Sequence, residues 1–198
     1  FLRSLEAHRM TPASPMRIAV ADSMRRSWAR PLATVGSPVV MDALLGHRKK
    51  STVKPGPALY AIRALALALA ENTAVAGRLV GNRIVHPRAI DIGFAVEVED
   101  GVLVPVLRDV DKTPLASLVE IYNKLVELAR ARRLPNDSRG PGIATVTNFG
   151  TFGIVWATPI PVTKAELTLS FDHRILDGGG AGRLLSRVAQ LLQQPEKL

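Results

Sequence analysis

The sequence predicts an α/β fold, in which a mixed sheet is flanked by helices, and three observations support this prediction. Stretches with helical periodicity alternate along the chain with stretches of strand periodicity. The 198 residues are enough for one domain with a sizeable core. Hydrophobic residues make up 47% of the chain and charged residues 22%, which is typical of a globular protein. We therefore expect helices and strands packed around one sheet.

Caps and apolar patterns predict the elements of the first third of the chain. Helices are expected over 16–28, 42–50 and 58–71, and a short strand over 38–41. Ser14 and Pro15 are an N-cap and a first-turn proline for the first helix, and Asp42 is the expected cap of the second. The third helix is apolar and alanine-rich, which predicts burial on most of its sides.

Turn residues then predict two hairpins and the remaining elements. The strands pair 79–80 with 83–85 and 92–99 with 102–107, around the two-residue turns Gly81-Asn82 and Asp100-Gly101. A helix over 114–133 and a strand over 143–148 follow. The last helix is expected to bury an apolar stripe of Ala181, Leu184, Leu185, Val188, Leu191 and Leu192.

Charge and composition restrict the possible partners. The net charge is +9 and the pI about 10.6. Nucleic-acid binding is one interpretation, but no RNP, zinc-finger or helix-turn-helix pattern accompanies the charge, so we expect no nucleic-acid partner. A scattered basic surface is the simpler interpretation, and a positive field that concentrates a phosphate-bearing ligand is the third. The absence of cysteine excludes disulfides and thiolate chemistry, and no run approaches the roughly 18 apolar residues of a membrane span.

A histidine lies where a predicted strand meets the last helix. Apolar and polar residues alternate over 167–171, His173 follows, and Asp177 comes four residues later, before glycines 178–180. A lone histidine in such a corner more often holds a turn than reacts. The aspartate and the glycines favour catalysis, because glycine lets a ligand approach the backbone and the helix start offers amide donors. A metal site is disfavoured, since no third ligand lies at a recognisable spacing.

A second polar cluster ends the strand predicted over 143–148. It consists of Thr147-Asn148-Phe149-Gly150, and Thr158-Pro159-Ile160 follows in the chain. Taken alone, β-branched residues before Asn-x-Gly are typical of a strand and a turn without a function.

Together these motifs resemble the dihydrolipoamide acyltransferases of 2-oxo acid dehydrogenase complexes, whose fold is like that of chloramphenicol acetyltransferase. The His-x-x-x-Asp-Gly segment and the Thr-Asn-x-Gly segment occur in the family's order. Residues 16–21 are similar to the family's first basic helix, and 94–97 with 101–106 to its central hairpin. The resemblance runs from about Ser14 to Pro195, which implies an N-terminal arm or linker end over 1–13 and a catalytic domain over 14–198.

The resemblance implies an acyltransferase whose catalytic set is His173, Asp177 and Thr147. His173 would be the general base and Thr147 the oxyanion donor, while Asp177 would hold the histidine loop. Asp172 and Arg174 are expected to form structural ion pairs. Coenzyme A would be a substrate, the lipoyl group would be carried on a separate domain, and no metal would take part.

The resemblance also implies partners and a location. Family members form homotrimers with the site at the subunit interface, and the trimers assemble into a cage with the other components of a 2-oxo acid dehydrogenase complex. The expected location is the bacterial cytoplasm or the mitochondrial matrix. Two alternatives stay open: an acyltransferase-like scaffold without turnover, and a small-molecule acetyltransferase of the chloramphenicol acetyltransferase type. The acyl group is not specified.

One segment departs from the family pattern. Between Ile160 and Leu167 this chain has only six residues, where family members carry a longer stretch with a further strand. Either the protein is truly shortened there, or residues have been left out and the ends joined. Because removing a strand from a sheet would leave backbone groups unpaired, we expect the second: residues are missing between 160 and 167.

Overall fold

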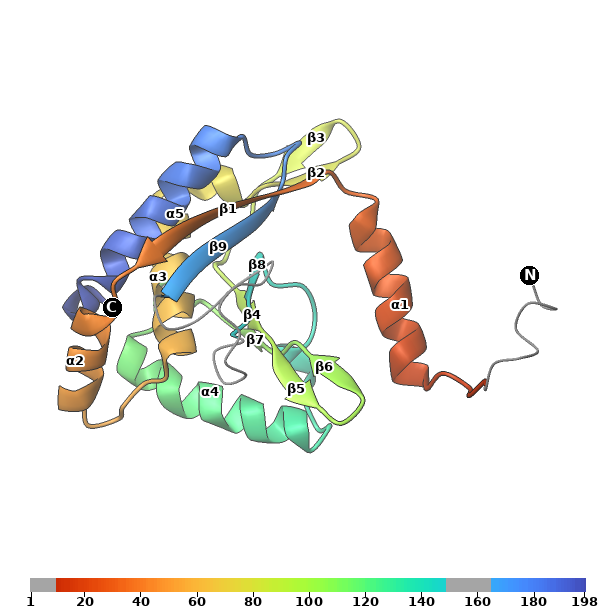
Figure 1. Ribbon diagram of the computed structural model, residues 1–198, viewed down its shortest axis with the longest axis horizontal. Coiled ribbons are helices and arrows are strands. Elements are labelled where there is room, and N and C mark those ends of the chain that lie inside the picture. The colour runs from red at the N-terminus through yellow and green to blue at the C-terminus, as the bar shows by residue number, and fades with distance from the viewer. Residues whose placement is uncertain (1–9, 149–164) are drawn as a thin grey trace.

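The computed structural model describes residues 10–148 and 165–198, which fold as a mixture of helices and small sheets (Figure 1). The α-helices among them are α1 (Pro15–Trp28), α2 (Asp42–Lys50), α3 (Pro57–Glu71), α4 (Leu115–Arg130) and α5 (Gly178–Leu192), and the 3-10 turns are η2 (Thr73–Ala76), η3 (Asn136–Ser138) and η5 (Pro195–Lys197). The strands are β1 (Leu32–Val39), β2 (Arg78–Val80), β3 (Arg83–Val85), β4 (Ile92–Phe94), β5 (Val96–Val98), β6 (Gly101–Leu103), β7 (Val106–Leu107), β8 (Ala144–Val146) and β9 (Ala165–Asp172).

The described strands form four small sheets, where the sequence analysis expected them around one. β1 pairs with β9, β2 with β3 and β5 with β6, all antiparallel, while β4 lies between antiparallel β7 and parallel β8. One of the breaks follows Ala95, whose N–H still donates to the carbonyl of Val146 at 3.0 Å. Among the described strands, the chain beyond it, β5, pairs with β6 alone.

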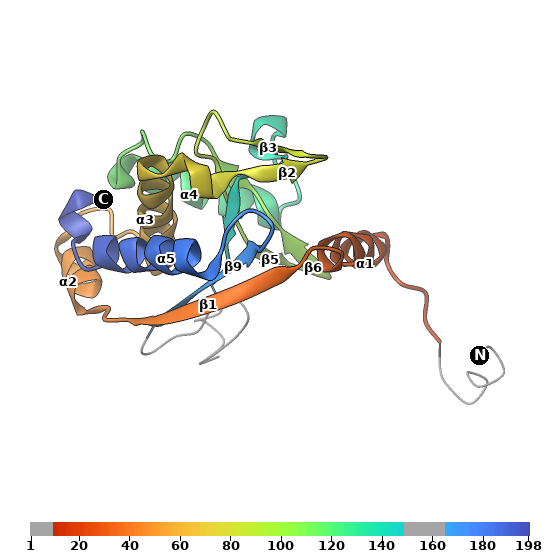
Figure 2. The ribbon, with the colours of Figure 1, turned by 90° about the horizontal axis from the view of Figure 1, so that it is seen from above.

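The core lies between α3, α4, α5 and the inner faces of the strands. α5 lies along β1 and β9, with α3 on its other side (Figures 1 and 2). All six residues of the stripe predicted for α5 are buried, as are Leu59, Tyr60, Ile62, Ala64, Ala66, Ala68 and Leu69 of α3. Fully burying a leucine-sized side chain contributes about 1.5–3 kcal/mol, so this packing stabilises the scaffold beneath the histidine corner.

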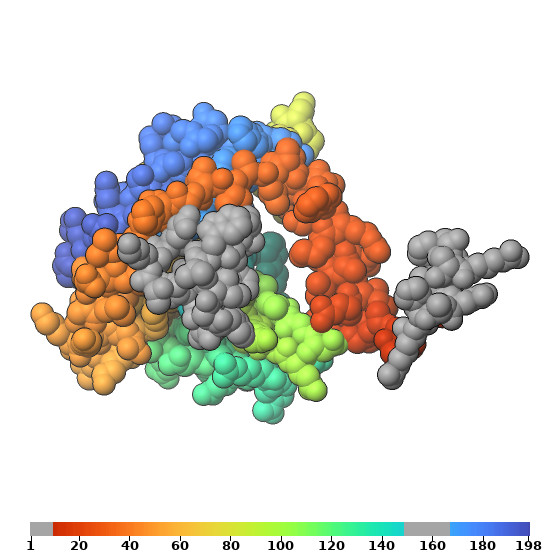
Figure 3. Space-filling model, in the orientation of Figure 1, coloured from red at the N-terminus to blue at the C-terminus, as the bar shows by residue number. Residues whose placement is uncertain are grey.

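Helix α1 begins as predicted but stands at the side of the body (Figure 3). The Ser14 side chain accepts a hydrogen bond from the Arg17 N–H at 3.1 Å, which confirms the N-cap. None of the residues of α1 is buried. The helix reaches the body at the β5–β6 turn, where Ser14 contacts the Asp100 carboxylate and Arg17 forms an ion pair with it.

Other boundaries differ from the prediction because strand pairing is not local. β1 begins at Leu32 rather than at residue 38, since all eight of its residues pair with β9. Pro38 fits there because β1 lies at an edge among the described strands, where a missing N–H is tolerated. Met41, not Asp42, is the N-cap of α2, and Asp42 is its first residue. Within residues 10–148 and 165–198, no helix has the length and apolar character needed to cross a membrane.

Candidate active site

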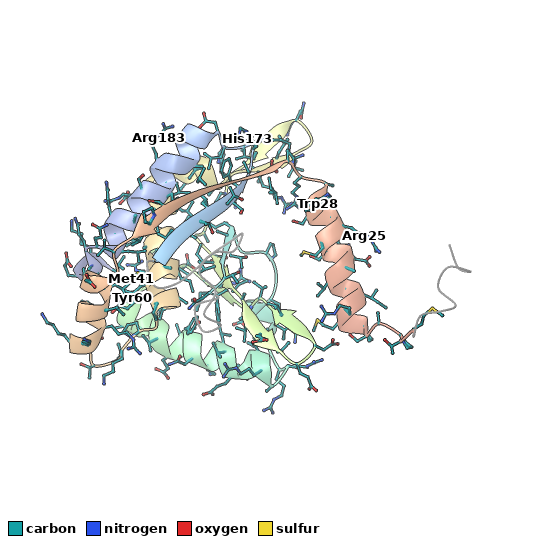
Figure 4. All side chains as sticks on the ribbon, viewed as in Figure 1. Arg25, Trp28, Met41, Tyr60, His173 and Arg183 are labelled. Carbon is teal, nitrogen blue, oxygen red and sulfur yellow. The ribbon has the colours of Figure 1, made fainter. Side chains whose placement is uncertain are left out.

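His173 lies directly after β9, at the corner where the chain turns toward α5 (Figure 4). Its backbone N–H donates to the carbonyl of Pro31 at 2.9 Å, which extends the β1–β9 pairing by one step. The side chain is exposed, and its ring lies 5.6 Å from the ring of buried Phe171 at an interplanar angle of 37°. The corner therefore fixes the backbone of the histidine while the imidazole remains accessible.

The two residues on either side of His173 in the sequence form an ion pair. Arg174 donates from Nε and Nη2 to the two carboxylate oxygens of Asp172, at 2.9 and 2.6 Å. The Arg174 backbone N–H also donates to Asp172 Oδ1 at 3.0 Å. These hydrogen bonds lower the pKa of the Asp172 carboxyl below its ordinary value. The expected structural pair is confirmed, and it closes the turn that presents His173.

Asp177 caps the helix that follows. Its Oδ1 accepts a hydrogen bond from the Gly180 N–H at 2.6 Å, in the geometry of an N-cap. A Cβ at Gly180 would lie 2.5 Å from Leu176 Cδ1, so a larger residue there would require the Leu176 side chain to move. The carboxylate thus joins the end of the loop after His173 to the first turn of α5.

Thr147 lies directly after β8, and its side chain is half-buried. β8 runs parallel to β4, with Val146 opposite Phe94. His173 follows a strand of the β1–β9 sheet, so the two predicted catalytic residues extend from different sheets. Phe149, Gly150, Thr158-Pro159-Ile160 and the short segment over 161–164 lie outside the described residues.

The sequence analysis missed a charged pocket behind the histidine loop. Arg187 of α5 donates from Nε and Nη2 to both carboxylate oxygens of Glu71, at 2.7 and 2.6 Å. Arg183 lies one turn earlier on α5, beside the corner (Figure 4). The i,i+4 spacing of these arginines is a signal for one shared helix face, but no local pattern brings Glu71 of α3 to it.

The comparisons with known proteins agree with this architecture. The family model of the 2-oxoacid dehydrogenases acyltransferase (catalytic domain) matches residues 6–165 and 161–198. The dihydrolipoyllysine-residue succinyltransferase component of the 2-oxoglutarate dehydrogenase complex from Bartonella vinsonii subsp. berkhoffii is 31% identical over 201 residues, covering 84% of this chain and 49% of that protein. The chain thus spans about half the length of the curated relatives it matches.

Solved structures show the same fold. Dihydrolipoamide acetyltransferase from Azotobacter vinelandii superposes with a TM-score of 0.85 at 24% identity, covering 99% of this chain and 96% of that chain. The cubic core of the pyruvate dehydrogenase multienzyme complex gives a TM-score of 0.85 at 25% identity, with the same coverage. The predicted fold class is confirmed. Since the family model matches nearly the whole sequence, this chain belongs to the 2-oxo acid dehydrogenase acyltransferase family and comprises its catalytic domain.

Proposed function

We propose that this domain transfers an acyl group between a dihydrolipoyl thioester and coenzyme A. The observation that carries the proposal is the exposed imidazole of His173 on a backbone fixed by Pro31, in a chain of this family. A neutral imidazole near pH 7 accepts a proton from a thiol, and the thiolate is the attacking form. His173 takes the proton of the coenzyme A thiol. The new carbon–sulfur bond forms, the old one breaks, and the proton passes to the departing dihydrolipoyl sulfur.

Thr147 supplies the oxyanion donor in this proposal. A threonine hydroxyl donates one hydrogen bond, and a single such donor contributes on the order of 2.7–4 kcal/mol to transition-state stabilisation. In the Azotobacter vinelandii enzyme, the catalytic mechanism has been investigated at a serine, a histidine and an asparagine four residues after the histidine. The present chain carries Thr147, His173 and Asp177, with the same spacing between the last two.

We further propose that the domain acts as a homotrimer within a larger cage, where it meets a separate lipoyl domain and the other components of the complex. Three features support this: the placement of His173 and Thr147 on different sheets, the similarity to a cubic core, and the uncovered helix α1. Trp28 of α1 is 90% exposed, with Ile18 and Met24 also exposed on the same helix. An apolar set of this kind is suited to burial against a second copy.

The oligomeric state tests the trimer. Sedimentation equilibrium of the wild type is expected to give a multiple of three protomers. Trp28→Ala should shift the equilibrium toward smaller species, whereas Val102→Ala, at an exposed position of the β5–β6 hairpin, should not. A wild-type monomer at all concentrations would contradict the proposed assembly.

The natural domain, we propose, carries further residues between 160 and 167. The two matches to the family model meet at 161–165, within this segment. The alignment with the Bartonella relative is 201 residues long but covers only 84% of this 198-residue chain, so the relative has additional residues inside the aligned part. Peptide mapping of the protein from its source tests this. A single peptide that reads directly from Ile160 through six residues to Leu167 would contradict it.

A substrate panel tests the activity itself. We expect purified protein to transfer acyl groups from one of acetyl-, succinyl- or branched-chain acyl-coenzyme A to dihydrolipoamide. If the protein folds and assembles but transfers no acyl group, the scaffold alternative is favoured. If it prefers a small hydroxylated acceptor, the chloramphenicol acetyltransferase type is favoured. The reducing compartments in which such complexes work, the bacterial cytoplasm or the mitochondrial matrix, are the proposed location.

A further inference from the structure

We propose that a pocket behind the His173 loop binds a small carboxylate with a short alkyl chain, separately from the acyl-transfer site. The pocket has a volume of about 360 Å³ and lies between the end of α3, η2, the loop over 175–177 and the first turns of α5. Its walls include the apolar side chains of Ala68, Ala74, Val75, Leu176 and Leu184. A volume near the lower end of the range for ligand pockets suits a small molecule.

One positively charged side chain at the pocket has no anionic partner among the described residues. Both carboxylate oxygens of Glu71 are occupied by Arg187. Asp177 Oδ1 is occupied by the Gly180 N–H. Arg183 also lines the pocket, and among residues 10–148 and 165–198 it has no hydrogen-bond or ion-pair partner. An exposed arginine without a carboxylate, at the edge of an apolar pocket, is the group that an incoming anion would engage.

The position of Arg183 directs its charge toward the start of α5. A Cβ placed on Gly179 would lie 3.3 Å from Arg183 Nη1, so the guanidinium lies over the glycine segment. Asp177 is the nearby charge that opposes an anion. Its carboxylate is in turn balanced by the amide groups of the helix start, whose dipole favours negative charge. The Arg183 guanidinium at the pocket favours a carboxylate, and the apolar walls favour its alkyl chain.

The pocket shares a wall with the histidine corner. Ile175, Leu176 and Asp177 line it, and they form the connection between His173 and α5. A ligand in the pocket would therefore contact the loop that presents the proposed general base without touching the base itself. Binding is measured without turnover, so its outcome is independent of the proposed acyl transfer.

A titration monitored by backbone amide chemical shifts tests the site. Butyrate is the probe, butyramide its neutral counterpart, and inorganic phosphate an anion without an alkyl chain. We expect saturable butyrate shifts over 175–184 and at Val75, with at least tenfold weaker binding of butyramide and of phosphate. Arg183→Gln should weaken butyrate at least tenfold. Arg130→Gln, an exposed arginine at the end of α4, should leave it unchanged.

Three results would overturn the proposal. They are the absence of saturation in the wild type, equal affinity in Arg183→Gln, and phosphate or butyramide binding as tightly as butyrate. Because the Arg183 side chain is exposed and has no hydrogen-bond or ion-pair partner in the described part of the chain, the variant is expected to retain the wild-type circular dichroism spectrum and melting temperature. If the variant lost this structure, the comparison of butyrate with butyramide in the wild-type protein would still test whether the negative charge of the ligand is needed.

Discussion

The His173 corner and the Thr147 strand end are supported in different ways. The corner combines a long-range backbone bond to Pro31 with two local contacts, the Asp172–Arg174 pair and the Asp177 cap. Thr147 follows a strand of only three residues, whose position depends on pairing with β4, about fifty residues earlier in the chain.

The two regions differ in how far apart in the sequence their contacting residues lie. Beyond its anchor on β1, the loop after His173 is held mostly by contacts between neighbours in the chain. The threonine is positioned by a parallel pairing between strands that a long connection separates in the sequence. For a site that draws one group from each region, we expect the chemistry to depend most on the histidine, then on the threonine, and least on the contacts that hold the corner.

The largest expected effect is that of His173→Ala. General acid–base catalysis typically contributes about 10²–10⁴-fold to the rate, so kcat/KM for transfer to dihydrolipoamide should fall on the order of a thousandfold. The melting temperature and the oligomeric state should stay unchanged, because the imidazole is exposed. His86→Ala, at an exposed histidine after β3, is the matched control and should retain full activity. Retention of more than a few per cent of activity by His173→Ala would show that another group is the base.

The next effect is that of Thr147→Val, which keeps the shape of the side chain and removes the hydroxyl. Loss of one oxyanion donor should lower kcat on the order of a hundredfold with little change in KM. Thr147→Ser retains the donor and should be nearly silent. Steady-state kinetics of both variants decide the role. Equal turnover in Thr147→Val and wild type would remove the threonine from the mechanism.

The sequence separation of contacting residues also explains which features could be predicted from the sequence. Three features were predicted correctly: the N-cap at Ser14, the Gly81-Asn82 hairpin and the apolar stripe of α5. Each follows from a pattern of residues that lie close together in the sequence. The Asp172–Arg174 pair also belongs to this class, because two residues of opposite charge two positions apart meet in a tight turn.

Features that depend on distant segments could not be predicted. The start of β1 at Leu32 depends on β9, which lies more than a hundred residues later. The local sequence predicted this strand only from residue 38, and the pairing extends it back to Leu32. The ion pair between Glu71 and Arg187 likewise depends on how α3 packs against α5, which no periodicity encodes. The Arg183 pocket was missed for the same reason.

A smaller effect is expected from the cap of α5. Asp177→Ala removes the acceptor for the Gly180 N–H, and loss of an N-cap typically costs about 1 kcal/mol of folding stability. Because the cap ends the histidine loop, kcat should fall more than KM rises. Asp177→Asn is the matched control, since asparagine caps as well as aspartate and should preserve both stability and rate. Urea unfolding and kinetics measure the two effects. A fully active Asp177→Ala would show that the cap does not position His173.

The smallest effect concerns the pH dependence of the Asp172–Arg174 pair. Hydrogen bonds from Arg174 lower the pKa of Asp172 in the folded protein. A lowered folded-state pKa contributes stability that is present above the unfolded value of about 3.9 and is lost as the pH falls through the folded-state pKa. Arg174→Gln should therefore be slightly less stable than wild type at pH 7, and the difference should shrink as the pH falls below about 4. Arg130→Gln, which has no carboxylate partner among the described residues, should show no such pH-dependent difference. Urea unfolding of the three proteins between pH 7 and pH 3 measures it, and a difference that grows toward acid would contradict the assigned ion pair.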